Sequence, residues 1–333
     1  MTTLQQVQRR ARVPAELGGS RLDQAAAAVF AEFSRARVQQ WIEAGDLLVD
    51  GGRRRPRDRV LGGEWLALDA AVLAAGEWAQ QAVPFRVVYE DAELMVIDKP
   101  AGVVVHPAAG NPDHTLLNGL LLHCPELRAL PRGGIVHRLD KDTTGLMVVA
   151  KTLRAHASLV AQLRARSVRR EYDALVCGQL ISGGTVNAPI GRHPRERTRM
   201  AVVAGGREAT SHYRVVRRFP THTLLRVSLE TGRTHQIRVH MAHRGHPLVG
   251  DPVYGGRQRM PAGLSPVAQP TLGEFRRQAL HAARLALVHP GDGGERCWEA
   301  PLPADFATLL AALAADAGTS ARGSSDARGS SDD

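Results

Sequence analysis

The sequence predicts an α+β protein with two domains, in which a small N-terminal α/β module precedes a larger domain built on a mixed, largely antiparallel sheet. Three observations predict this class. The chain has 333 residues, 44% of them hydrophobic, which is enough for a large core and more than one domain. Strand-like and helix-like runs follow one another without the regular alternation of a parallel sheet. An alanine-rich stretch separates the two parts.

The N-terminal module is predicted over residues 19–69, after an extension over residues 1–18. An alanine-rich helix opens at Arg21, and a second helix starts after Ser34, a residue type that caps helix N-termini well. This second helix carries three apolar residues at helical spacing, Val38, Trp41 and Ile42. Short strands follow it.

Two segments are predicted to lie outside the domains. Residues 70–83 are alanine-rich with few core or turn signals, which indicates a linker. Residues 313–333 are small and polar and contain the hexamer ARGSSD twice, which predicts a disordered tail. The larger domain therefore covers residues 84–312.

The larger domain contains apolar runs of strand length at Leu94–Asp98, Leu146–Ala150, Tyr172–Val176 and Leu224–Leu229. A helix is predicted over Thr152–Val168, because its apolar residues share one face.

The formal charge of +10 is carried almost entirely by arginine. Residues 190–240 contain 11 Arg and 3 acidic residues, and a second basic cluster lies at residues 53–59. Two separate basic patches favour a polyanionic partner such as RNA over a merely solvated surface.

The three cysteines are widely spaced and include no CxxC pair, which argues against a disulfide framework or a thiolate zinc cluster. The N-terminus lacks the apolar run of a signal peptide, and no apolar stretch is long enough to span a membrane. We therefore expect a cytoplasmic protein without a membrane partner.

Residues 134–151 read GIVHRLDKDTTGLMVVAK and place two carboxylates, Asp140 and Asp142, among basic side chains. A core does not tolerate such a density of charge without a purpose. From the residues alone, the pattern fits both an Asx-type turn with surface ion pairs and a catalytic site.

The string HRLDKDTTGLMVVAK resembles the signature of the pseudouridine synthases that act on large-subunit ribosomal RNA. The resemblance implies the pseudouridine-synthase fold, in which helices flank a mixed, largely antiparallel sheet with a central cleft, and a catalytic aspartate at Asp140. It also implies that Arg138 fills the gap left when the target uridine turns out of its helix. Such flipping is required because a stacked base is inaccessible.

Two further motifs resemble the same family. RREYDALV places on Tyr172 an aromatic ring that stacks on the target base. ETGRTHQIRVH, predicted to form a helix capped by Thr234, places on Arg238 a buried salt-bridge partner that keeps Asp140 ionised. The resemblance implies further substrate contacts from His106, His137, Thr144 and Ile237.

The N-terminal module resembles an S4 RNA-binding domain in the series RLDQ and SRARVQQWIEAGDLLVDG and in the arginines that follow. The resemblance implies RNA contacts from Arg21, Ser34, Arg35, Arg37, Arg53, Arg54 and Arg55.

The reaction implied by the resemblance is an isomerisation without redox change, so neither a metal nor an organic cofactor is expected. The implied partner is 23S ribosomal RNA or a precursor of the large ribosomal subunit, at the helix 69 stem-loop of the subunit interface. One chain should contain a complete site, so a monomer is expected.

Two other classes remain compatible with the residues. A metal-dependent hydrolase is suggested by four clustered histidines, His235, His240, His243 and His246, although the HExxH pattern is absent. A non-catalytic RNA-binding protein would explain the S4-like module and the basic patches without using Asp140.

Overall fold

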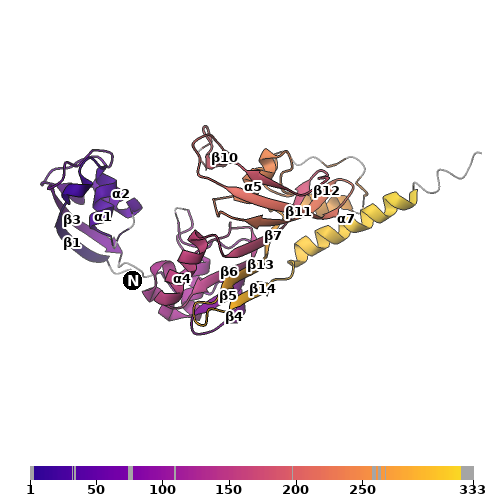
Figure 1. The fold of residues 1–333 in the computed structure, drawn as a ribbon, viewed down its shortest axis with the longest axis horizontal. Helices are drawn as coiled ribbons and strands as arrows, with labels where there is room; N and C mark the ends of the chain where they lie inside the picture. The colour runs from indigo at the N-terminus through magenta and orange to yellow at the C-terminus, as the bar shows by residue number, and fades with distance from the viewer. Residues whose placement is uncertain are drawn as a thin grey trace, which may run out of the picture. The chain divides into compact units, whose positions relative to one another are not determined.

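In the computed structural model, the chain divides into two compact units, Met1–Glu77 and Trp78–Asp333, which are described separately (Figure 1). The structure describes residues 4–31, 33, 35–73, 78–108, 110–196, 198–256, 260–261, 264–266 and 268–323.

The first unit is a three-stranded antiparallel sheet with two α-helices. The sheet has the strand order β1 (Leu4–Arg12), β3 (Trp65–Leu73), β2 (Leu47–Val49). The other elements are a 3₁₀ turn at Ala15–Leu17, α1 (Leu22–Val29) and α2 (Arg35–Ala44). Leu22, Val38, Trp41 and Ile42 from the helices pack with Leu66 and Leu68 of β3 in one core.

The structure corrects two predicted boundaries of this unit. Residues 4–12, expected in an extension, pair with β3 along their whole length, from Leu4 opposite Leu73 to Arg12 opposite Trp65. The first residues of the predicted linker, 70–73, belong to β3. Backbone pairing explains both differences: the edge strand β1 needs few apolar side chains once its hydrogen bonds are satisfied by a neighbour, and its first residues extend the pairing of β3 to residue 73. Ser34, the predicted N-cap, lies outside the described residues.

The second unit is built on a nine-stranded mixed sheet. Its order is β4 (Arg86–Glu90), β5 (Leu94–Lys99), β6 (Thr144–Ala150), β13 (Leu280–Val288), β7 (Arg169–Cys177), β12 (His222–Leu229), β11 (Thr210–Arg218), β8 (Gly184–Asn187), and β14 (Glu295–Glu299) pairs with β13. Of the strand pairs described in this sheet, β13 with β6 is parallel and the others are antiparallel. The predicted mixed, largely antiparallel sheet is confirmed. A separate two-stranded ribbon joins β9 (Ile190–Arg192) and β10 (Met200–Val202).

Helices cover both faces of the sheet. The helical elements are α3 (Leu116–His123), 3₁₀ turns at Pro125–Ala129 and Pro131–Gly134, α4 (Leu153–Arg164), α5 (Gln236–His243), α6 (Ala268–Glu274) and α7 (Ala304–Gly323). Met147 and Val149 of β6 pack in a core with α3 and α5, whereas Leu146 and Val148 pack in a core with α4. Because successive strand residues face opposite sides, coverage of both faces makes β6 apolar throughout, which is why its sequence does not alternate.

The structure also differs from the sequence-based boundaries of this unit. Part of the predicted linker packs on it, since Asn118 Nδ2 donates to the Ala79 carbonyl at 2.8 Å and Trp78 packs against the main core. Residues 313–323, expected to be disordered, continue α7. Leu309 and Leu313 lie one turn apart and are buried together with Phe306, which offsets the weak core signal of the neighbouring small residues. Residues 324–333 of the predicted tail lie outside the described residues. No helix within the described part of the chain is long and apolar enough to cross a membrane.

Candidate active site

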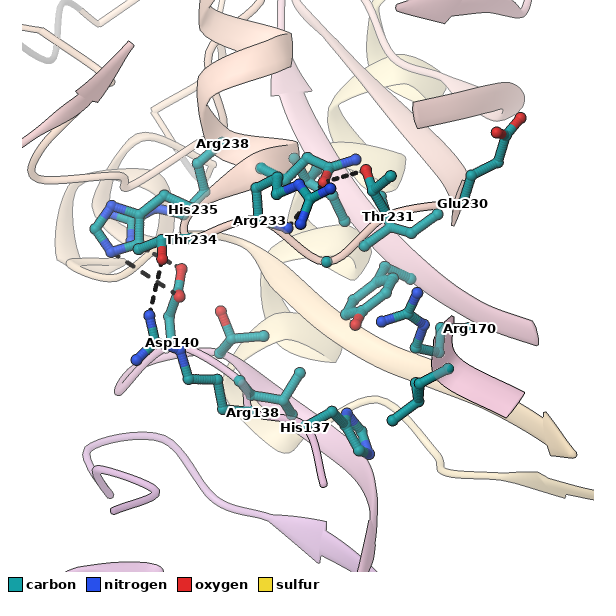
Figure 2. A pocket seen from close by; sticks show the side chains of 18 of the residues that line it. His137, Arg138, Asp140, Arg170, Glu230, Thr231, Arg233, Thr234, His235 and Arg238 are labelled. Atoms are coloured by element: carbon teal, nitrogen blue, oxygen red, sulfur yellow. Dashed lines mark hydrogen bonds and ion pairs between the residues drawn. The ribbon is translucent and has the colours of Figure 1, made fainter. Parts of the chain in front are cut away.

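A cavity of about 550 Å³ opens in the second unit, and three separate chain segments line it. They are the loop that leads into β6, the stretch from the end of α4 into β7, and the turn between β12 and α5, and the single residues Arg207 and Leu280 complete the lining. Six of the predicted site residues line this cavity: His137, Arg138, Asp140, Tyr172, Ile237 and Arg238. Figure 2 shows Asp140 on its loop with Arg238 and His235 opposite.

Asp140 forms an ion pair with Arg238 across the cavity wall. Arg238 Nη1 donates to Asp140 Oδ2 at 3.0 Å, and the arginine side chain is 5% exposed while that of the aspartate is 22% exposed. Arg238 also contacts Asp251, with Nε 2.7 Å from Oδ2 and Nη2 2.9 Å from Oδ1. Burial opposes the charged form of Arg238, but the two carboxylates outweigh it and raise its pKa above the usual value. The guanidinium is therefore a permanent cation beside Asp140.

His235 approaches the other oxygen of Asp140, with Nε2 3.9 Å from Oδ1. His235 occupies the N-cap position of α5. Its φ of 58° is a backbone conformation that residues other than glycine rarely adopt. Its Nδ1 pairs with the Tyr254 hydroxyl at 2.8 Å. Burial lowers the pKa of His235, although Asp140 opposes the shift, which favours the neutral imidazole.

Thr234 was predicted to cap α5, and this prediction is wrong, because His235 holds the cap position. The Thr234 hydroxyl instead accepts a hydrogen bond from Arg138 Nη2 at 2.8 Å. This contact joins the loop of Asp140 to the turn before α5, as Figure 2 shows.

His137 and Tyr172 contribute uncharged groups to the cavity. His137 Nε2 accepts the backbone N–H of Val148 at 3.0 Å, and burial lowers the pKa of His137 to about 3. Tyr172 is 6% exposed, and burial raises its pKa even though Arg170 opposes the shift. Both side chains are therefore neutral near pH 7.

Two predicted substrate contacts do not line the cavity. Thr144 is buried and its Oγ1 pairs with His281 Nδ1 at 2.8 Å, beside the parallel junction of β6 and β13. His106 packs edge-on to Trp78, with ring centroids 5.1 Å apart. Neither residue therefore shares the cavity surface with Asp140, although Thr144 stands only four residues after it in the sequence.

Arginine dominates the charged lining of the cavity. Seven arginines besides Arg238 line it: Arg132, Arg138, Arg164, Arg166, Arg170, Arg207 and Arg233. The acidic residues in the same lining are Asp140 and Glu230, and Glu230 is paired with Arg166 and His212. These seven arginines, which we call the arginine wall, surround one carboxylate. Such an arrangement is suited to an anionic, phosphate-bearing substrate.

Sequence reasoning missed most of this arginine set, as well as Asp251 and Tyr254. The arginine-rich composition of residues 164–170 and 190–240 was the available signal for the wall. Asp251 and Tyr254 belong to the string HPLVGDPVYGG, whose glycines and prolines indicate a loop, and nothing in its composition indicates that it would hold Arg238.

The clustered histidines do not converge on one point. His240 pairs with Ser211 Oγ and the Ala188 carbonyl, and His246 Nδ1 lies 2.9 Å from the Cys177 carbonyl. Among the residues whose placement is described, no three His, Cys, Asp or Glu side chains group together as a metal site would require. The hydrolase hypothesis therefore lacks its ligand set in this part of the chain.

In the S4-like unit, two of the predicted RNA contacts share a buried carboxylate. Arg21 Nη2 and Arg35 Nη2 lie 3.0 and 2.8 Å from Asp23 Oδ2. Burial alone would raise the pKa of Asp23, but the two arginines lower it. The others are distributed differently: Arg54 lies 3.9 Å from Glu64, the Arg55 side chain is 90% exposed, and Arg37 and Arg53 are exposed.

Comparisons with known proteins agree with this arrangement. Residues 93–243 match the family described as RNA pseudouridylate synthase, and residues 20–66 match the S4 domain. A relative from Pseudomonas aeruginosa, named ribosomal large subunit pseudouridine synthase D, is 61% identical over 93% of this chain and 97% of its own length. A relative of the same name from Escherichia coli K12 is 52% identical over 94% of this chain and 96% of its own length.

Solved structures show the same likeness. Human RNA pseudouridylate synthase domain containing 4 is 27% identical, with a TM-score of 0.53, and the match covers 69% of this chain and 93% of that one. Human RNA pseudouridylate synthase domain containing 1 is 25% identical, with a TM-score of 0.53, over 69% of this chain and 87% of that one.

Proposed function

This chain belongs to the RNA pseudouridylate synthase family, and on that premise we propose that it isomerises uridine to pseudouridine in 23S ribosomal RNA, with Asp140 as the catalytic carboxylate. The names of the bacterial relatives support the large ribosomal subunit as the source of the RNA. The single observation that carries the role of Asp140 is its position, because it is the carboxylate held by Arg238 in a cavity lined with arginines.

The proposed reaction conserves all atoms of the nucleoside. The bond between the ribose C1′ and the uracil N1 breaks, the detached uracil rotates in the cavity, and C5 bonds to C1′. The proton lost from C5 is balanced by the proton gained at N1. No electron acceptor is involved, and confinement keeps the two fragments together, so the proposal includes neither a metal nor an organic cofactor.

We propose that one side chain stacks on the flipped base and that another takes the place of the base in its helix. Tyr172 lies in the cavity wall as a neutral ring on which uracil can stack. Arg138 is exposed at the cavity and can fill the space that the base leaves in its helix, once it releases Thr234. His137 and Ile237 line the same cavity and are proposed to contact the nucleotide.

Asp140 can act on the ribose in either of two ways. As a nucleophile it bonds to C1′, and as a base it removes the proton from C2′ to give a glycal. Deuterium at C2′ distinguishes the two routes. A primary isotope effect on the single-turnover rate supports the base, and its absence supports the nucleophile.

The finer assignments follow from the same premise. We propose helix 69 of 23S RNA as the target, in free RNA or in a precursor of the large subunit whose maturation the modification supports. Because Asp140, Tyr172 and Arg238 meet in one cavity without a second copy of the chain, we propose a monomer, and since bacterial ribosomes assemble in the cytoplasm, we propose that location. The S4-like unit would hold the RNA through Arg21, Ser34, Arg35, Arg37, Arg53, Arg54 and Arg55.

The decisive experiment maps pseudouridine in 23S RNA from cells that lack this protein and from cells that carry only Asp140→Asn. The matched control is Asp142→Asn, which removes a carboxylate two residues away that does not line the cavity. We expect the same sites to be lost in the deletion and in D140N, and retained in D142N. Retention in D140N would instead favour a non-catalytic RNA-binding protein.

A further inference from the structure

We propose that Asp251 is a positioning residue for this reaction, because it aims the guanidinium of Arg238 at Asp140 and shares its positive charge. The inference rests on the proposed role of Asp140. It concerns a side chain that belongs to the turn after α5 and that does not line the cavity.

The geometry of Asp251 is fully determined by its neighbours. Its side chain is 0% exposed and its Oδ1 accepts the backbone N–H groups of Val253 and Tyr254, at 2.9 and 3.0 Å. The same carboxylate accepts Nε and Nη2 of Arg238 at 2.7 and 2.9 Å. The loop backbone thus fixes the carboxylate, and the carboxylate fixes one edge of the guanidinium.

A guanidinium is planar, so fixing the Nε and Nη2 edge also fixes the direction of the remaining nitrogen. That nitrogen, Nη1, lies 3.0 Å from Asp140 Oδ2. Holding the flexible methylenes of Arg238 in this position costs side-chain entropy, which the two hydrogen bonds to Asp251 offset. Asp251 therefore supplies the orientation that a lone arginine would lack.

Asp251 also changes the charge that Asp140 experiences. The two carboxylates and one guanidinium together carry one negative charge, since Arg238 is shared between them. If Asp251 were neutral, the full charge of the buried Arg238 guanidinium would act on Asp140 over 3.0 Å. The carboxylate would then be held more tightly as an anion and would be a weaker nucleophile or base.

The turn that carries Asp251 braces the second neighbour of Asp140 as well. Tyr254 lies three residues later, its ring is 5.1 Å from Arg238 Cζ, and its hydroxyl pairs with His235 Nδ1 at 2.8 Å. The turn tolerates little change, because a Cβ at Gly250 would meet the Arg277 carbonyl oxygen at 2.3 Å. One rigid turn thus supports the groups on both sides of Asp140.

The test compares purified wild type with Asp251→Asn in steady-state kinetics on 23S RNA transcripts across a pH range. We expect kcat to fall by about tenfold to a hundredfold, because small errors in alignment cost rates of this size. KM should stay within about twofold, since the arginine wall is intact. The acid limb of the kcat profile should move to lower pH.

Asp173→Asn is the matched control, because Asp173 is a nearly buried carboxylate paired with Arg226 at 2.7 Å outside the cavity. A purely structural effect would lower kcat in both variants. The inference is overturned if D251N keeps the wild-type kcat and acid limb, or if D173N reproduces its kinetics.

A double-mutant cycle keeps the test decisive if D251N does not fold. R238Q has no guanidinium for residue 251 to orient. Adding D251N to R238Q should therefore leave kcat unchanged. A further fall in the double variant would show that Asp251 acts elsewhere and would overturn the inference. Asp140→Ala is assayed in parallel: if it retains activity, the proposed function fails, whereas an inactive D140A beside a fully active D251N refutes only the role of Asp251.

Discussion

The ammonium group of Lys99 donates a hydrogen bond to the carbonyl oxygen of Lys141, 2.8 Å away, and so ties the end of β5 to the residue that follows Asp140. Its other two donors reach the carbonyl oxygens of Pro100 and Val103, at 2.7 and 3.0 Å. Lys99 is 0% exposed. Lys99 thereby anchors the loop of Asp140, although it does not line the cavity itself.

Replacing Lys99 should change how stability depends on pH. Burial lowers the pKa of Lys99 to about 7, whereas the unfolded chain keeps the usual value near 10.5. Between these values the unfolded state binds more protons, so the contribution of this site to the unfolding free energy rises with pH. Urea denaturation should show the wild type gaining stability relative to Lys99→Met from pH 7 to about 10. Parallel curves for the two proteins would contradict this.

The half-buried imidazole of His137 should produce an effect of the same sign at acid pH. Its pKa of about 3 lies below the usual value of 6.5, so the unfolded chain binds the proton first as the pH falls. The wild type should therefore lose stability between pH 6.5 and 3, and His137→Gln, whose amide oxygen can still accept the Val148 N–H, should lose less. Equal acid sensitivity in chemical denaturation would refute the explanation.

Gly145 should not tolerate even one methyl group. Its φ is +109°, and a Cβ there would lie 2.3 Å from the Ala282 carbonyl oxygen, where β6 meets β13. We expect Gly145→Ala to cost at least about 3 kcal/mol of unfolding free energy. Gly245→Ala is the control, since Gly245 also has positive φ, at +81°, but has open space around it. Gly245→Ala should cost only about 1 kcal/mol of unfolding free energy. Equal costs for the two variants would show that backbone strain at positive φ, and not the clash of the new Cβ, sets the loss of stability.

The role of Arg138 can be tested by the structure of the substrate. If it fills the space of a flipped base, Arg138→Ala should impair the reaction on a stem-loop about tenfold more than on an unstructured oligonucleotide. The reason is that only a base stacked in a helix loses stacking energy when it flips out. Arg154→Ala, which removes an exposed arginine paired with Glu93 and not lining the cavity, should affect neither substrate. A uniform loss on both RNAs would assign Arg138 to general binding.

The arginine wall should set the salt dependence of RNA binding. Arg132 and Arg207 line the cavity and are exposed, so Arg132→Gln/Arg207→Gln should reduce the slope of log affinity against log salt by about 1 for each residue. Arg86→Gln, which removes an arginine paired with Asp98 away from the cavity, should leave the slope unchanged. Filter binding at several salt concentrations measures both. An unaltered slope in the double variant would mean that phosphates do not reach these residues.

The sequence predicted those parts of the structure whose signals are local. Strands β5, β6, β7 and β12 and helix α4 lie where apolar runs and helical spacing placed them. Strand β1 was missed because its exposed face carries glutamine and arginine, and an edge strand is defined by its partner rather than by its own composition.

The site was predictable for those motif residues that line the cavity, and not for those whose side chains lie elsewhere. Asp140 and Arg238 meet although 98 positions separate them, and only the family resemblance linked them. Thr144 stands four residues after Asp140, but β6 starts there and directs it toward His281 instead. Asp251 and Tyr254 could not be assigned, since their function depends on how the turn after α5 lies against that helix.

The position of β13 has a consequence for synthesis. This strand is made after residue 279, yet it lies in the middle of the sheet between β6 and β7. Until β13 has left the ribosome, no strand joins β6 to β7. The loop of Asp140 and the strand of Tyr172 then belong to two separate parts of the sheet. The S4-like unit can fold as soon as it emerges, but catalytic competence must wait for nearly the whole polypeptide.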